Sequence, residues 1–140
     1  MTQKPLINKI AQKAIIQLDP ASLIPKATNI VAFDIKGFLF KELILREKDF
    51  RDALKQYSFD SLEDKSIYVF CSSDAIIPMW AYMLLGTYLN KIAKQVVFAE
   101  SLVDAEEQFV LQNIEHLKIE VYTNQRIVVK GCGEKNFSPL

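Results

Sequence analysis

The chain has 140 residues, half of them apolar, which is the usual size of one domain that buries a hydrophobic core without disulfides or metals. Its 17 lysine and arginine residues balance its 17 aspartate and glutamate residues. No excess of positive charge is present to neutralise a row of phosphates, so the composition argues against nucleic acid as a partner. We expect a single domain over residues 1–140.

The first residues, MTQKPLINKIAQKA, lack the apolar core and the small-residue cleavage site of a signal peptide, so a cytoplasmic location is expected. The longest uncharged run, 75–90, is shorter than the roughly 20 residues that cross a bilayer. It predicts a buried helix and no membrane association. In a reducing cytoplasm the two cysteines, Cys71 and Cys132, are expected to be free thiols.

The first third of the chain combines helix and strand signals. Apolar residues at three- and four-residue steps over 6–18 predict an N-terminal helix that ends at Asp19, with a strand over 14–18 as the alternative. The β-branched and aromatic residues of 30–35 predict a strand. Gly37 permits a bend after that strand.

From residue 46 onward, strands and helices alternate. Short apolar strands that alternate with helices of this length indicate right-handed βαβ crossovers, and hence an α/β fold with a central, mostly parallel sheet and flanking helices. The all-apolar runs VVF and IVV favour strands that are covered on both faces. The expected helices are 46–57, 78–93 and 102–117, and the expected strands are 66–71, 95–100 and 126–131.

Both cysteines occupy positions where parallel sheets bind ligands. Such ligands lie beyond the carboxyl ends of the strands. Cys71 ends the strand 66–71, and Cys132 follows the strand 126–131. If these strands lie close in one sheet, the two thiols meet at one edge. A helix N-terminus near Pro78 would favour a reactive thiolate at Cys71.

A metal or iron–sulfur site at this edge would use the two cysteines as ligands. Asp74, Glu134 or His116 would complete the set, but a full four-ligand set with compact spacing is missing. A dimer would supply further ligands, and the bound species would be an iron–sulfur cluster or zinc. The expected metal ligands are Cys71, Cys132 and Asp74, and the expected cofactor-binding residues are Ser72, Ser73, Gly131 and Gly133.

Two other interpretations stay open. The first is a small thiol-dependent enzyme with Cys71 as nucleophile, although the sole histidine, His116, lies at a helix end without a triad-like motif. The second is a protein-interaction module whose cysteines only fill space, as free cysteines commonly do.

Other residues that attract attention have structural interpretations. Asp34 lies between Phe33 and Ile35 in the strand 30–35, and the alternation of side chains favours an outward-facing carboxylate over a buried, paired one. The helix 78–93 is apolar all round, so its large side chains are expected in the core or in a subunit interface. These side chains are Trp80, Tyr82, Met83 and Tyr88.

Three segments resemble successive signature segments of the bacterial family named domain of unknown function 2480. They are FDIKGFLFKELILREKDFR, CSSDAIIPMWAYMLLGTYL and VVKGCGEK, and they span most of the chain from about residue 31 to residue 135. The resemblance implies a link to iron–sulfur assembly, because genes of this family lie beside genes of the SUF-type machinery. It implies iron–sulfur assembly proteins as partners and keeps Cys71, Asp74 and Cys132 as the candidate site.

Together these observations favour an accessory or binding protein connected with iron–sulfur or thiol homeostasis. Its site would be formed by Cys71 and Cys132 at the sheet edge. We also expect a homodimer, formed through an apolar helix or a sheet edge.

Overall fold

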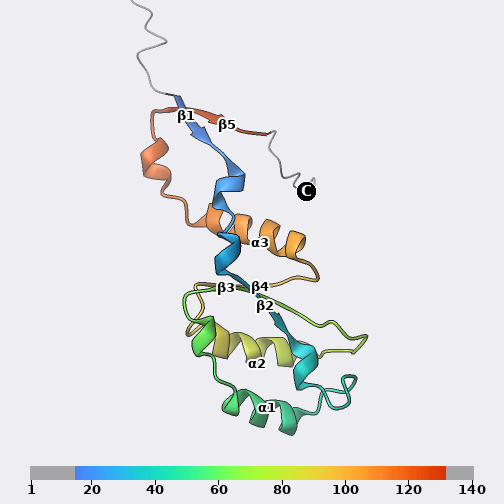
Figure 1. The fold of residues 1–140 in the computed structure, drawn as a ribbon. Helices are drawn as coiled ribbons and strands as arrows, with labels where there is room; N and C mark the ends of the chain where they lie inside the picture. The colour runs from blue at the N-terminus through green and yellow to red at the C-terminus, as the bar shows by residue number, and fades with distance from the viewer. Residues whose placement is uncertain (1–14, 132–140) are drawn as a thin grey trace, which may run out of the picture.

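The computed structural model describes residues 15–131, and its centre is a three-stranded parallel sheet (Figure 1). The strands β2 (Ile30–Asp34), β3 (Ser66–Phe70) and β4 (Gln95–Phe98) lie in the order β2-β3-β4. Helix α2 (Met79–Leu89) connects β3 to β4. The predicted α/β class with parallel strands and flanking helices is confirmed.

Helices cover both faces of this sheet (Figure 1). Helix α1 (Glu47–Gln56) and helix α2 lie on one face, and α3 (Leu102–Glu115) lies on the other. All three helices were expected from the sequence. Short 3-10 helices fill the connections: η1 (Pro20–Leu23), η2 (Ala27–Asn29), η3 (Ile35–Phe38), η4 (Asp60–Leu62) and η5 (Ile119–Tyr122).

The larger core lies between the sheet and the pair α1 and α2. Phe50 and Leu54 of α1 are fully buried, as are Leu85 and Leu89 of α2. They pack against Ile67 and other sheet residues. On each helix these buried residues lie four positions apart, which places them on one stripe of the helix surface that faces the sheet.

The smaller core, under α3, combines apolar and polar contacts. Phe109 of α3 is fully buried beside Val97 of β4. Next to them, the Ser66 hydroxyl donates to Gln95 Oε1 at 3.4 Å, and the Gln95 amide donates to Asn113 Oδ1. The Asn113 amide in turn donates to the carbonyl of Leu23 at 2.6 Å. This network joins β3, β4 and α3 to η1.

Helix α3 also covers the outer edge of β4. The Gln108 side chain donates to the carbonyl of Phe98 at 2.7 Å, and that of Gln112 donates to the carbonyl of Val96 at 3.2 Å. Unpaired backbone groups at a sheet edge are a template for unwanted pairing. These two glutamines therefore occupy carbonyls that another chain could otherwise reach.

A second, two-stranded parallel sheet lies at one end of the molecule (Figure 1). Strand β1 (Ile15–Leu18) pairs with β5 (Arg126–Val129), and we call this pair the ribbon. Beyond its end, Lys130 Nζ lies 3.0 Å from Asp19 Oδ2, and the Lys130 N–H donates to the carbonyl of Leu18. Two segments far apart in the sequence are thus joined at both backbone and side chain.

The ribbon corrects two predictions. Residues 15–18 form a strand, so the N-terminal helix was wrong there and the alternative is confirmed, while residues 6–14 lie outside the described part. Strand β5 was expected to be covered on both faces, yet all its residues are exposed. The physical reason is the pairing, because β5 contacts β1 and lies in a different sheet from β3. The domain boundaries 1–140 stay a prediction.

The segment after β2 turns back on itself. Gly37 lies within η3 and does not have a positive φ, whereas Lys41 and Glu42 do, at 51° and 60°. They form the turn between Phe40 and Ile44, which pair as an isolated antiparallel bridge.

In the described part of the chain, no helix combines the length and apolar character that a membrane span requires.

Candidate functional site

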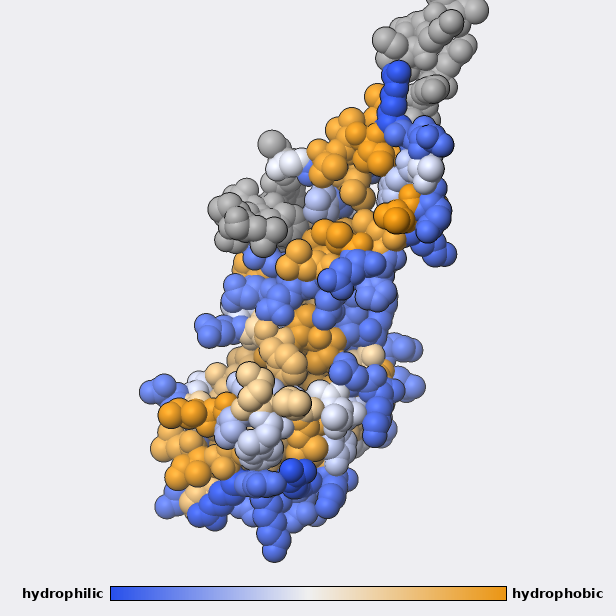
Figure 2. Space-filling view, turned by 180° about the vertical axis from the view of Figure 1, so that it is seen from behind, coloured by the Kyte–Doolittle hydropathy of each residue, from blue (hydrophilic) through white to orange (hydrophobic). Residues whose placement is uncertain are grey.

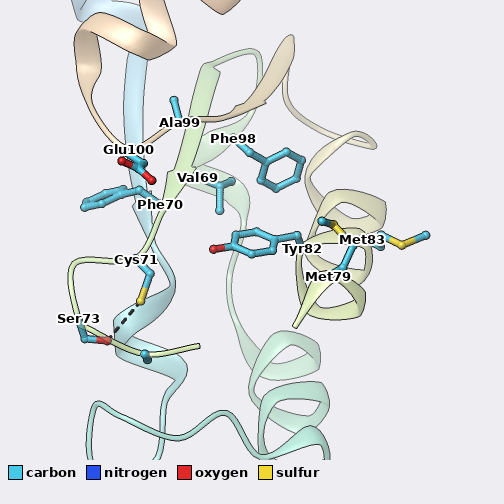
Figure 3. Close-up of a pocket in the computed structure, with 11 residues that line it drawn as sticks. Val69, Phe70, Cys71, Ser73, Met79, Tyr82, Met83, Phe98, Ala99 and Glu100 are labelled. Atoms are coloured by element: carbon cyan, nitrogen blue, oxygen red, sulfur yellow. Dashed lines mark hydrogen bonds between the residues drawn. The ribbon is translucent and has the colours of Figure 1, made fainter. Parts of the chain in front are cut away.

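A cavity of about 610 Å³ opens at the carboxyl ends of β3 and β4, with α2 on one side (Figure 3). This is the position at which ligands bind in open parallel sheets. Most of the wall is apolar, and a small number of polar groups converge on it, as in typical small-molecule sites. The apolar wall includes Val69, Phe70, Met79, Tyr82, Met83 and Phe98, and the polar groups come from Cys71, Ser73 and Glu100.

Cys71 provides the thiol of this cavity. It follows the last residue of β3 and is partly exposed. Its Sγ lies 3.3 Å from the hydroxyl oxygen of Ser73, as the dashed line in Figure 3 shows. The segment 72–78 separates Cys71 from the first residue of α2, Met79, so the thiol does not lie in the first turn of the helix.

Asp34, at the end of β2, holds the loop that carries the thiol. Its carboxylate accepts from the Ser72 N–H at 3.1 Å, from the Ser72 hydroxyl at 2.5 Å and from the Lys36 N–H at 2.9 Å. Burial alone would raise the pKa of Asp34. The hydrogen bonds from Ser72 and Lys36, with the Lys36 charge, outweigh it and lower that pKa. Asp34 is partly exposed between the buried Phe33 and Ile35, which agrees with the predicted outward-facing position, and its carboxylate is hydrogen-bonded as well.

Tyr82 forms the opposite side of the cavity. Its ring packs edge-to-face on Phe98, with ring centroids 5.4 Å apart. Figure 3 shows its hydroxyl directed toward the strand that carries Cys71. Burial, and then the negative charges of Cys71 and Glu100, raise the pKa of Tyr82. At neutral pH this phenol is therefore a hydrogen-bond donor.

The structure places the predicted site residues in different surroundings. Cys71 and Ser73 both line the cavity. Ser72 is exposed and bonds Asp34, and Asp74 is exposed and does not line the cavity. Gly131 is exposed, and Cys132, Gly133 and Glu134 lie outside the described residues.

His116 does not reach the cavity. It caps the C-terminus of α3, and its Nδ1 lies 2.7 Å from the carbonyl oxygen of Gln112. The N-terminus of α3 follows Glu100, so the helix, about 20 Å long, separates His116 from the cavity. The sole histidine is therefore not a base for Cys71.

The two cysteines were expected to meet if the strands before them lie close in one sheet. The strand order does not meet this condition. Strand β5, which precedes Cys132, pairs with β1, whereas β3, which precedes Cys71, lies in the other sheet. Over residues 15–131 no group of three or more His, Cys, Asp or Glu side chains could hold a metal ion. The donor set that the structure describes around Cys71 does not fit a metal or a cluster. The joint site with Cys132 stays a prediction.

Sequence reasoning missed several residues of this cavity. Glu100 and Phe98 lie at the end of β4, so the strand-end argument used for Cys71 pointed to them equally. Tyr82 and Met83 were assigned to the core or an interface, because periodicity does not show which part of an apolar helix stays exposed. Met83 is 67% exposed at the cavity.

Comparison with family models gives a match to the family described as protein of unknown function (DUF2480), over residues 4–139. The chain belongs to this family. The resemblance seen in the three sequence segments is thereby confirmed for nearly the whole chain. No curated protein and no solved structure is detectably similar to the chain. The connection with iron–sulfur assembly genes stays a prediction.

Proposed function

We propose that this protein binds a small, largely apolar molecule in the cavity between β3, β4 and α2, with the Cys71 thiol in contact with the ligand. The observation that carries the proposal is the cavity itself. Its position, its size of about 610 Å³ and its apolar wall with few polar groups are those of a small-molecule site. Glu100, Ser73 and the Tyr82 hydroxyl would orient the ligand's polar end.

The hydrogen bonds of Asp34 support this role for Cys71. Ser72 is fixed to β2 through two hydrogen bonds, one from its backbone and one from its side chain. The neighbouring residues Cys71 and Ser73 are thereby held at the cavity wall. A loop with fixed polar groups loses less conformational entropy on binding, which favours affinity.

The test measures ligand capture by an apolar fluorescent probe, anilinonaphthalene sulfonate, in the wild type and in variants that reduce either of two cavities. Ala75→Phe reduces the Cys71 cavity, which Ala75 lines. Ala32→Phe is the matched control, because Ala32 lines a separate, more open cavity of about 490 Å³. We expect Ala75→Phe to weaken probe binding at least tenfold and Ala32→Phe to leave it unchanged. Equal binding in all three proteins would contradict the proposal.

A second candidate is a thiol-dependent enzyme, and the observation that favours it is the carboxylate of Glu100 in the same cavity as Cys71. Glu100 would then accept the thiol proton as Cys71 attacks an acyl group. Incubation with p-nitrophenyl acetate tests this. An acyl-enzyme releases one equivalent of p-nitrophenol in a burst, and the burst would disappear in Cys71→Ser and slow in Glu100→Gln.

Thiol homeostasis and iron–sulfur assembly are the biological settings proposed for this site, in the cytoplasm and in a homodimer. The thiol in a ligand-sized cavity supports the role in thiol homeostasis. To test the role in iron–sulfur assembly, iron and acid-labile sulfide are measured in protein purified without oxygen, with Cys71→Ser and Cys132→Ser as variants. Loss of stoichiometric iron in both variants would support a shared cysteine site.

A further inference from the structure

The ribbon of β1 and β5 exposes apolar side chains. Ile127, Val128 and Val129 of β5 are 42%, 52% and 60% exposed, and Ile15 of β1 is 56% exposed. Figure 2 shows apolar side chains gathered at this end of the molecule. An isolated two-stranded sheet is marginally stable at best, and parallel strands are normally covered on both faces. Within residues 15–131, the ribbon does not receive that cover.

The register gives the ribbon two different faces. Ile16 lies opposite Ile127, and Leu18 lies opposite Val129. Side chains alternate along a strand, and paired residues of neighbouring strands point to the same side. These four residues therefore share one face that is entirely apolar. The other face carries Arg126 and Gln17, together with Ile15 and Val128.

We propose that the ribbon is the surface through which two copies of this chain associate. The apolar face of one copy would pack on the same face of the other across a two-fold axis, as in most homodimers. This inference rests on the proposed homodimer, and it is independent of the ligand proposed for the Cys71 cavity.

The composition of the exposed surface agrees with this occupant. In η5, which precedes β5, Ile119 is 72% exposed and Val121 is 59% exposed. Together with Ile127 and Val129 of the apolar face, they supply exposed apolar side chains for an interface that, at standard size, buries ~800 Å² on each partner, only part of it apolar. The chain has zero formal net charge, so two identical copies do not repel each other through net charge.

The test uses the full chain and sedimentation velocity at concentrations from about 1 to about 100 μM. Two variants place a charge on the proposed interface: Val129→Asp on the ribbon and Ile119→Asp on η5. Ile119 lies outside the strands, so this variant tests the surface even if Val129→Asp disturbs the pairing of β1 with β5. The matched control is Ile76→Asp, since Ile76 is 93% exposed and lies outside the ribbon and η5.

We expect a wild-type dimer whose dissociation constant rises roughly 30-fold or more in both interface variants and is unchanged in Ile76→Asp. A wild type that stays monomeric throughout would overturn the inference. Protection of 1–14 or 132–140 from hydrogen exchange would then identify the chain's own ends as the cover. A dimer insensitive to both interface variants would also overturn it. Probe binding in the Cys71 cavity of a monomeric chain would leave the proposed function standing.

Discussion

Asp34 and Ser72 lie at the ends of neighbouring parallel strands, and Ser72 donates both its N–H and its hydroxyl to the Asp34 carboxylate, at 3.1 and 2.5 Å. This contact joins β2 to the loop that follows β3. Because Ser72 lies between Cys71 and Ser73, the same contact fixes both cavity residues. The thiol is thus positioned by a carboxylate that does not line the cavity.

Replacing Asp34 with asparagine removes the charge from these hydrogen bonds. We expect Asp34→Asn to lower the free energy of unfolding by about 1–2 kcal/mol, since hydrogen bonds to an ionised group are roughly twice as strong as neutral ones. Urea denaturation measures this change. The control is Asp52→Asn, which removes an exposed ion pair to Lys55 at 3.7 Å and should cost less than about 0.5 kcal/mol. Equal costs for both variants would contradict the role assigned to Asp34.

The lowered pKa of Asp34 also gives a pH dependence with a definite sign. The group has an ordinary pKa of 3.8, and its folded-state pKa is lower. Its contribution to stability is therefore complete above pH 3.8 and is lost as the pH falls through the folded-state pKa. We expect the wild type to lose more stability than Asp34→Asn between about pH 5 and about pH 2. Urea denaturation at several pH values measures this. If the free energies of unfolding of the wild type and of Asp34→Asn changed equally with pH, the pKa of Asp34 would not be linked to folding.

The helical and strand pattern of the central sheet could be predicted from the sequence, whereas the partners of β1 and β5 could not. Strand β3 and helix α2 follow one another in the chain, and the hydrophobic period identifies each by itself. The apolar residues of β5 show that it is a strand but not which strand it pairs with. That choice depends on a contact with β1, more than a hundred residues away in sequence.

The candidate site was predicted in part for a similar reason. The strand-end argument located Cys71 and Ser73, which both line the cavity. It does not support the pairing of Cys71 with Cys132, which assumed one sheet for β3 and β5 and stays a prediction. The role of Asp34 depends on its alignment with Phe70 in the register of β2 and β3, which local alternation does not reveal.

The environment of Tyr82 can be tested by titration. Glu100→Gln removes one of the negative charges that raise the pKa of Tyr82, so we expect that pKa to fall toward its ordinary value of 10.0. The fall should be partial, because burial is the largest cause and remains. Carbon-13 NMR of labelled tyrosine follows this residue. The control Glu63→Gln, an exposed site outside the cavity lining, should leave the titration unchanged. An unchanged titration in Glu100→Gln would place the carboxylate away from Tyr82.

The polar network under α3 makes a further prediction. Asn113→Ala removes the side chain that accepts from the Gln95 amide and donates to the carbonyl of Leu23. These two partly buried groups then lose their hydrogen bonds to Asn113. We expect a loss of about 1–3 kcal/mol in the free energy of unfolding. Urea denaturation measures it against Gln56→Ala, an exposed position on α1 that should cost less than about 0.5 kcal/mol. A cost for Asn113→Ala no larger than this control would mean that the network does not hold α3.

The central claim is that Cys71 lies in a cavity that accepts apolar molecules, and its most direct test is the rate of thiol modification. In the Cys132→Ser protein, the rates with N-phenylmaleimide and with N-methylmaleimide are compared with those of glutathione. If the cavity accepts the phenyl group, the ratio of the two rates should exceed that of glutathione by about tenfold, since burying such a group is worth more than 1 kcal/mol. In Ala75→Phe, the ratio of the two rates should fall to that of glutathione. A ratio equal to that of glutathione, or a thiol that reacts only after unfolding, would contradict the account.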